Sequence, residues 1–425
     1  MFRFILILLT ITGLSLGLAW VADEPGSVTI DWGKWHMESS VLVLVAGTAI
    51  LALVCMMLYS LVFAILHSPR SWLRSRLAKR QALGLEALTA AFAAIATQDT
   101  RTARKQIKRA QQHLPHQPLT LMLASQVARL EGNESQSRLY LEQMLKSEST
   151  EFMAMRGLIE NARRSHDDDT ALAQAEKALE LKPNDPWLIT TLVGLYARKR
   201  RSQDALTLLD RAARKRAITR KEQRVLIAAV LYEHARPLVD QQRWDSAVPA
   251  LEDALKCQPG FAPASALLAE AFARQQDVPH ALKIIARAWK LGPHPLLTQA
   301  LLECHDHEDA RKKVAALAGK LISQHPGHRE SRYLASALAL KTGRFDKARD
   351  EIRYLLDERE SQRAALAMAE AEKVAGNEEE ALQWTRRARA AVPDAAFACE
   401  SCRQPSEVWQ LTCPQCGSVG GMTSK

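Results

Sequence analysis

The chain has 425 residues, of which 47% are hydrophobic and 18 are glycine, and its formal net charge is +10. This composition is too apolar for a disordered chain, and the length is too great for one ordinary hydrophobic core. The charge comes from 57 Lys and Arg against 47 Asp and Glu, an excess that permits nucleic acid or anionic lipid as a partner. The position of the charges along the chain has to decide between these two classes.

Two long apolar stretches open the chain. Residues 4–22, which follow Arg3, carry no charge, and residues 41–66 carry none either. As helices, each is long enough to cross a hydrocarbon core of about 30 Å. We therefore predict a two-span membrane hairpin over residues 1–67. A cleaved signal peptide is the alternative for the first stretch, but a cut after Ala22 would put bulky Trp20 where a small residue is needed.

The flanks of these stretches predict the topology. The polar segment between them holds one lysine, four acids and two tryptophans, as expected for a short hairpin at a membrane surface. A basic linker, residues 68–83, follows the second stretch. The positive-inside rule places both chain ends in the cytoplasm, so we expect a bacterial inner-membrane protein with two spans. We expect contact with anionic headgroups, worth about 1 kcal/mol per residue, from basic side chains in the linker. These are Arg70, Arg74, Arg76, Lys79 and Arg80.

Residues 84–394 repeat one pattern about nine times: a small or apolar residue is followed seven positions later by another. The first members of these pairs are separated by 34, 34, 34, 42, 34, 33, 34 and 33 residues. The pairs are Ala103 and Ala110, Ser137 and Met144, Ala171 and Ala178, Ala205 and Ala212, Ala247 and Ala254, Ala281 and Ala288, Val314 and Leu321, Ala348 and Leu355, and Ala381 and Ala388. Prolines recur at the ends of the units, where they stop one helix or start the next.

A period near 34 residues resembles the tetratricopeptide family, which implies an all-α, right-handed superhelix of stacked helix hairpins. In such an array the first helix of each pair lines a concave groove that holds a partner protein. The single 42-residue step inserts eight residues around residues 219–235. We expect a longer helix there, either as a docking shelf or as a tolerated insertion on the outer face.

Other basic clusters, at residues 198–201 and 211–224, have no interleaved aromatic residues that could stack on bases. They are typical of solvated helix surfaces, and we predict no nucleic-acid partner.

The last segment, residues 395–425, loses the repeat and carries two C-x-x-C pairs. Cys399 and Cys402 form the first pair, and Cys413 and Cys416 form the second. Four thiolates at this spacing suit a tetrahedral Zn²⁺ or, less often, a single iron. Because protein occupies all four positions, we predict a structural site that supplies the folding energy of the segment. A redox dithiol at either pair is the alternative.

Two family resemblances follow from these motifs. The two-span start, with Pro-Gly-x-Val-x-Ile-x-Trp-Gly at residues 25–33 ahead of the repeats, resembles the HemY family, whose members are encoded with heme-biosynthesis genes. The C-terminal segment, with Trp409 before its second cysteine pair, resembles the rubredoxin-like zinc ribbon of LapB. LapB-like proteins have one span, whereas two are predicted here. The first resemblance implies a scaffold for late heme synthesis, and the second an adaptor that regulates lipopolysaccharide synthesis or proteolysis of an envelope enzyme.

Heme itself has one candidate site, the cluster Cys304-His305-Asp306-His307 in an expected polar loop. A turn explains these residues equally well, and neither C-x-x-C pair is followed by the histidine of a heme attachment motif. Heme binding therefore stays open. The sequence has no Gly-x-Gly-x-x-Gly turn, Gly-x-Ser-x-Gly elbow, P-loop or His-Glu-x-x-His motif, so we predict that the protein is not an enzyme.

Overall fold

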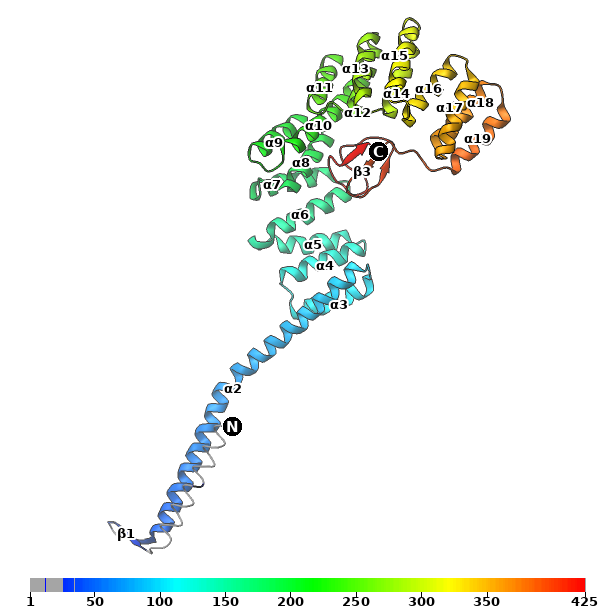
Figure 1. Ribbon diagram of the computed structural model, residues 1–425. Helices are drawn as coiled ribbons and strands as arrows, with labels where there is room; N and C mark the ends of the chain where they lie inside the picture. Colours follow the sequence, from blue (N-terminus) through cyan, green and yellow to red (C-terminus); the bar gives the residue numbers. More distant parts are fainter. Residues whose placement is uncertain (1–11, 13–25, 34, 425) are drawn as a thin grey trace. The chain divides into compact units, whose positions relative to one another are not determined.

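The computed structural model describes residue 12, residues 26–33 and residues 35–424. The first predicted span, residues 4–22, lies outside the described residues apart from Thr12. The chain divides into two compact units, Met1–Gly132 and Asn133–Lys425, and each is described by itself. Its helices and strands are labelled in Figure 1.

The first unit begins with a β-hairpin. Strands β1 (Ser27–Trp32) and β2 (Trp35–Ser40) are antiparallel, and their register runs from Ser27 opposite Ser40 to Trp32 opposite Trp35. Gly33 begins the two-residue turn with φ +67°, a left-handed conformation that glycine adopts without strain. The amide of Val41 donates to the carbonyl of Gly26 (3.1 Å) and so joins the base of the hairpin to the next helix. The predicted polar hairpin is therefore a β-hairpin.

Helix α2 (Val41–Ala96) combines the second predicted span with the first helix of the repeat array. Its stretch Val43–Phe63 has 21 residues with a mean hydropathy of 2.3, and none of these side chains is buried. At 1.5 Å per residue such a stretch spans about 31 Å, the thickness of a hydrocarbon core. The second predicted span is confirmed as one apolar helix of membrane-spanning length within the described residues.

The C-terminal part of α2 packs against α3 (Thr100–His113) and α4 (Pro118–Leu130). Gly84 permits this packing, because a Cβ atom at this position would lie 2.5 Å from Cδ1 of Leu114. The apolar stretch and the part that packs against α3 and α4 therefore belong to one continuous helix.

The second unit is an array of antiparallel helices followed by a small sheet. The array helices, in chain order, are α5 (Glu134–Met144), α6 (Glu148–Arg164), α7 (Asp168–Leu181), α8 (Pro186–Arg198), α9 (Ser202–Arg214), α10 (Arg220–Asp240), α11 (Trp244–Cys257), α12 (Ala262–Arg274), α13 (Val278–Leu291), α14 (Pro295–His305), the short 3-10 helix η1 (Glu308–Ala310), α15 (Arg311–Gln324), α16 (Arg329–Lys341), α17 (Phe345–Glu358), α18 (Gln362–Val374) and α19 (Glu378–Ala390). The predicted repeat fold is confirmed.

The repeated small residues all lie on the second helix of a pair, and every one of them is buried in the described structure. The turn before the second helix also repeats, except before α15, which follows η1. A residue with positive φ, such as His166 (58°) or Gly343 (71°), reverses the chain just ahead of the helix N-cap. The N-cap residue is often an acid or amide: Asp167, for example, accepts from the amide of Thr170 at 3.0 Å. Small residues, turns and caps therefore share the period read from the sequence.

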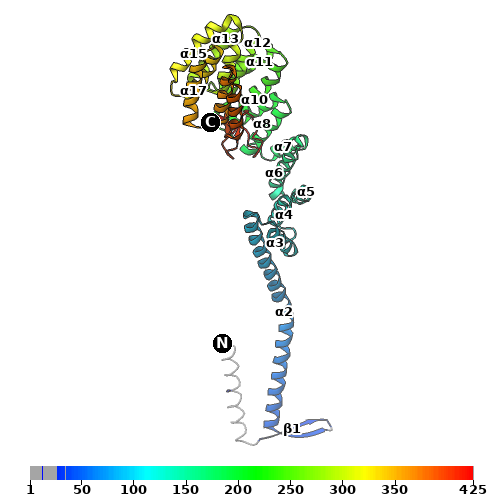
Figure 2. The ribbon, with the colours of Figure 1, turned by 90° about the vertical axis from the view of Figure 1, so that its right-hand side faces the viewer.

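The C-terminal ribbon, residues 395–424, contains three short strands in the order β4-β3-β5. They are β3 (Phe397–Cys399), β4 (Pro405–Ser406) and β5 (Met422–Ser424). Strand β3 is antiparallel to both neighbours. Figures 1 and 2 show the ribbon on the inner side of the curve that helices α8 to α19 form within this unit.

Two large clusters form the core of the second unit. One runs from α6 to α12 and includes ribbon side chains, among them Phe397, Trp409, Leu411 and Met422. The other runs from α12 to α16 around Trp289. The ribbon and the array therefore share one hydrophobic core.

Candidate metal centre

Four cysteine sulfurs converge in the ribbon. Their Sγ atoms all lie within 4.8 Å of one another. The Sγ atoms of Cys399 and Cys416 are 3.7 Å apart, and those of Cys402 and Cys413 are also 3.7 Å apart. A tetrahedral ion with metal–sulfur bonds of about 2.3 Å requires sulfur–sulfur edges of about 3.8 Å. The donor set therefore fits one tetrahedral metal ion and brings together all four predicted ligands.

The two C-x-x-C pairs are held by matching backbone turns. The amide of Arg403 donates to the carbonyl of Cys399 (2.8 Å), and the amide of Gly417 donates to that of Cys413 (2.9 Å). Arg403 and Gly417 occupy equivalent positions after the second cysteine of each pair, and both are left-handed, with φ of 59° and 71°. Each knuckle thus uses the same turn to direct two sulfurs to one point.

The charge of the cluster also favours a cation. Burial opposes ionisation of Cys399, but the Ser418 hydroxyl and the amides of Cys402 and Ser401 outweigh it and lower the pKa of Cys399 to about 6. At Cys402, a bond from the amide of Gln404 lowers the pKa. Burial and the three neighbouring sulfurs outweigh this bond and raise the pKa of Cys402 to about 12. Four adjacent thiolates repel one another, so a divalent cation is the charge that lets all four ionise together. With four protein ligands, such an ion would be structural.

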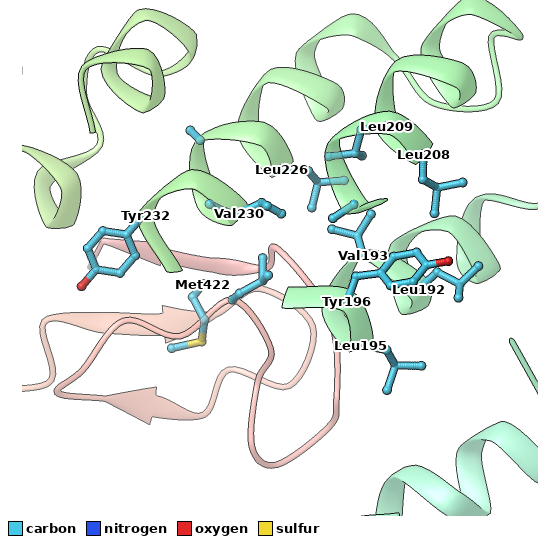
Figure 3. Packing of buried hydrophobic residues seen from close by; sticks show 14 of the residues in the cluster. Leu192, Val193, Leu195, Tyr196, Leu208, Leu209, Leu226, Val230, Tyr232 and Met422 are labelled. Atoms are coloured by element: carbon cyan, nitrogen blue, oxygen red, sulfur yellow. The ribbon is translucent and has the colours of Figure 1, made fainter. Parts of the chain in front are cut away.

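An aromatic cluster anchors the ribbon to the array. The ring of Trp409 lies edge-on to Tyr232 of α10 (5.3 Å between centroids) and to Phe261, the N-cap of α12 (4.9 Å). Its Nε1 donates to the carbonyl of Met422 (3.1 Å), so the indole is satisfied while buried. Figure 3 shows Met422 from the ribbon beside Tyr232, Val230 and Leu226 of the array.

The second knuckle, residues 411–420, makes the polar contacts with the array. Nη2 of Arg163, in α6, donates to the carbonyl of Gly417. Burial and then the nearby charge of Arg198 lower the pKa of Arg163, whereas Cys416 acts in the opposite direction. On α10, Oε1 of Glu233 accepts from the amide of Leu411 at 3.4 Å.

The closest approach is at Gly194 in α8. A Cβ atom at this position would lie 2.8 Å from Cγ2 of Val419 and 3.1 Å from Oγ1 of Thr412. These two ribbon residues face each other across an isolated β-bridge. The ribbon backbone is therefore seated directly on the middle of α8.

These contacts fall on the first helices of successive pairs, α6, α8 and α10, and at the start of α12. The eight-residue insertion lengthens α10 to 21 residues, against 13 in α8 and α12. The predicted longer helix is confirmed, and of the two expectations for it the docking shelf agrees with the structure, because α10 carries Leu226, Tyr232 and Glu233 to the ribbon.

The other sequence candidates do not converge in this way. Cys304 and His305 end α14 and are both buried, and Asp306 is paired with Lys341. Burial raises the pKa of Cys304 to about 11, so this sulfur stays a thiol at neutral pH. Among the residues that the structure describes, the grouping of three or more side chains suited to one metal ion is the four-cysteine set.

The basic cluster at residues 198–201 is largely neutralised within the array. Arg198 pairs with Asp168 (3.0 Å) and Lys199 with Asp169 (2.6 Å). Arg201 pairs with Asp204 (2.6 Å). These pairs are consistent with a structural role for the cluster.

The residues that hold the ribbon were not predicted from the sequence. Gly194 gave one signal, because a glycine in mid-helix costs roughly 1 kcal/mol and calls for a reason such as close packing. Arg163, Tyr232 and Phe261 look like ordinary helix residues, and nothing local distinguishes them.

Together, the fold and the site define a membrane-associated tetratricopeptide-repeat protein that ends in a four-cysteine ribbon. Residues 26–132 match the family described as HemY protein N-terminus, and residues 232–294 match a tetratricopeptide repeat family. The first match covers the β-hairpin, the apolar helix and the packed helices of the first unit, in agreement with the resemblance seen in the sequence.

Known proteins resemble the chain over different lengths. The probable magnetosome protein Mms48 of Magnetospirillum gryphiswaldense is 26% identical over 455 residues, which covers 98% of this chain and 92% of that protein. Among solved structures, a tetratricopeptide repeat protein from Parabacteroides merdae is 14% identical, with a TM-score of 0.34, and covers 56% of this chain and 93% of its own. YrrB, described as a tetratricopeptide protein with an unusual peptide-binding site, is 16% identical, with a TM-score of 0.32. The match covers 46% of this chain and 95% of YrrB.

Proposed function

We propose that the protein is a non-catalytic scaffold of the bacterial inner membrane that recruits partner proteins on the cytoplasmic face for late heme synthesis. In this function the array holds a pathway enzyme close to the membrane, so that a poorly soluble porphyrin intermediate passes on directly. The repeats would supply binding surface, and the ribbon would supply a metal-stabilised element with no open ligand position.

The observation that carries the proposal is the continuity of α2. One helix contains the apolar stretch Val43–Phe63 and then packs against α3 and α4, so the apolar stretch and the part of α2 that packs in the first unit belong to one continuous helix. The match of residues 26–132 to the HemY N-terminus covers this same region and supports the link to heme synthesis. The relative Mms48 is named as a probable magnetosome protein, so the support for a heme pathway comes from the family match alone.

The basic residues of the linker, residues 68–83, lie at different distances from the end of the apolar stretch. Arg70 and Arg74 follow Phe63 by about 10 and 16 Å along an α-helix, which puts them nearer to the headgroup region than the other three basic residues. Arg76, Lys79 and Arg80 lie up to about 25 Å away, beyond a Debye length of about 8 Å. Contact with anionic lipid is therefore proposed chiefly for the first two.

Co-purification tests the proposal. The full chain, extracted from native membranes in mild detergent, should carry a porphyrin-pathway enzyme with it, and a deletion strain should accumulate porphyrin intermediates. A chain lacking residues 1–67 is the matched control, since it keeps the array but loses the anchor. Absence of any pathway enzyme together with normal porphyrin levels would refute the proposal.

The four-sulfur geometry of the ribbon favours a second candidate, a LapB-like adaptor that controls lipopolysaccharide synthesis or presents an envelope enzyme to a protease. This function predicts that Cys413→Ser, which removes one metal ligand, changes the lifetime of an envelope enzyme in pulse-chase experiments. Unchanged lifetimes in that strain would exclude this candidate.

A further inference from the structure

The ribbon covers the surface that a scaffold of this fold would offer to a partner. It contacts the first helices α6, α8 and α10 and the start of α12, from the inner side of the array (Figures 1 and 3). We propose that the ribbon is an internal ligand of this groove, that bound metal holds it in place, and that loss of the metal exposes the groove to a partner segment. The partner step rests on the proposed scaffold function.

The position of the contacts explains why the metal would control docking. The carbonyl that accepts from Arg163, the side chains against Gly194 and the amide that donates to Glu233 all lie in the second knuckle, around Cys413 and Cys416. A segment of about 30 residues has too little apolar surface to fold by burial alone, so the metal supplies its folding energy. Without the metal, the second knuckle is no longer fixed by the four sulfurs, so these groups lose the positions in which they meet the array.

The ribbon does not close the groove completely. A pocket of about 640 Å³, open to solvent, lies between the ribbon and the starts of α10 and α12. Its walls include Leu226, Phe261, Trp409 and Met422. Because solvent reaches this side of the contact, the ribbon is not enclosed there as a core helix is, and it can leave at a lower cost.

The contacts of the ribbon define the partner that could replace it. Such a segment needs an aromatic side chain to take the place of Trp409 between Tyr232 and Phe261, and a carboxylate or carbonyl to accept from Arg163. It also needs small or β-branched residues where Val419 lies on Gly194. The groove therefore fits an extended protein segment that carries an aromatic anchor and an acidic group.

Hydrogen exchange on the full chain in detergent tests the docking directly. We compare zinc-loaded protein with protein stripped by a chelator under reducing conditions. The expected result is about tenfold faster exchange in the ribbon and in α8 and α10 after stripping, with α16 and α18 unchanged. Unchanged exchange in α8 and α10 after stripping would overturn the proposal. An equal increase in α16 and α18 would also overturn it, because the metal would then stabilise the whole array and not the ribbon contact alone.

A variant separates docking from metal binding. Gly194→Leu suits a helix better than glycine but drives a side chain into Val419 and Thr412, so it should raise exchange in α8 and the ribbon while zinc content stays at one ion per chain. Gly319→Leu on α15 is the matched control, because nothing lies within 4 Å of a Cβ atom there. Unchanged exchange in Gly194→Leu would contradict the proposal. These measurements contain no partner, so their failure and the failure of the scaffold proposal are distinguishable.

Discussion

A buried ionic cluster shows how single residues stabilise the second half of the array. Glu330 on α16 is 4% exposed and accepts from both terminal nitrogens of Arg363 (2.6 and 2.8 Å) and from the hydroxyl of Thr298 (2.6 Å). Arg363 also lies over the ring of Tyr333, 4.0 Å from its centroid. Burial alone would lower the pKa of Arg363, but the contacts with Glu330 outweigh it and raise the pKa. One carboxylate thus links α14, α16 and α18.

Removing this carboxylate should destabilise the array strongly. We expect Glu330→Ala to cost about 3 kcal/mol, because it leaves the Arg363 guanidinium and the Thr298 hydroxyl without their acceptor. Thermal unfolding of the detergent-solubilised chain, followed by circular dichroism, measures the loss. Glu142→Ala is the control, since Glu142 forms an exposed pair with Arg138 at 3.8 Å and should change little. Equal melting of the two variants would show that the cluster contributes nothing.

Helix α10 is the element on which the ribbon and the array meet. Its N-terminus has a capping box, in which Thr219 and Glu222 each accept a hydrogen bond from the other's backbone amide. The Thr219 hydroxyl accepts from the amide of Glu222 (3.2 Å), and the Glu222 carboxylate accepts from the amide of Thr219 (2.8 Å). The backbone bond, and then the bond from the Thr219 hydroxyl, lower the pKa of Glu222 below its ordinary value of 4.5. The cap starts the helix beside the pocket under the ribbon.

This cap should make the first turn of α10 sensitive to acid. The pKa of Glu222 is lower in the folded protein than in the unfolded chain. The stabilisation that the ionised carboxylate gives to the folded state is therefore complete above about pH 4.5, and it is lost as the pH falls through the pKa of the folded protein. Thr219→Ala should remove about 1 kcal/mol at neutral pH and weaken this acid dependence, because the hydroxyl bond is lost while the bond from the backbone amide remains. Hydrogen exchange of α10 at pH 7 and pH 4 measures both effects. Thr207→Ala, in the exposed face of α9, serves as control, and identical pH responses in the two variants would refute the role of the cap.

At the scale of the whole molecule, the charges around α2 predict its orientation. Five basic residues follow the apolar stretch, whereas the hairpin region before it has four acids and one lysine. From the positive-inside rule we therefore predict that the array lies on the cytoplasmic side.

Protease protection in sealed membranes tests this orientation. In inverted inner-membrane vesicles, trypsin should digest the array and the ribbon, whereas in intact spheroplasts both should be protected, because the membrane separates them from the enzyme. Detergent lysis of the spheroplasts is the control, since it should restore digestion. Digestion of the array in intact spheroplasts would reverse the predicted topology.

Much of this protein was predictable from local pattern. The repeat period, the buried small residues, the second apolar helix and the four clustered cysteines all depend on spacings within one helix pair or one knuckle. A spacing such as that between Ala205 and Ala212 fixes one helical face regardless of what happens elsewhere in the chain. Because the pattern recurs in every unit, the period of the other repeats located even the irregular unit around η1.

The tertiary structure alone decided where the ribbon lies. The hydrogen bond from Arg163 to Gly417 joins residues 254 positions apart, and the one from Leu411 to Glu233 joins residues 178 apart. No periodicity connects such positions, because the curvature of the array sets which helices face the tail. The sequence by itself determined a membrane-attached array and a four-cysteine segment. Their joining into one core around Trp409 and Gly194 depended on long-range packing, which sums small contacts over many helices and leaves little local trace beyond the mid-helix glycine.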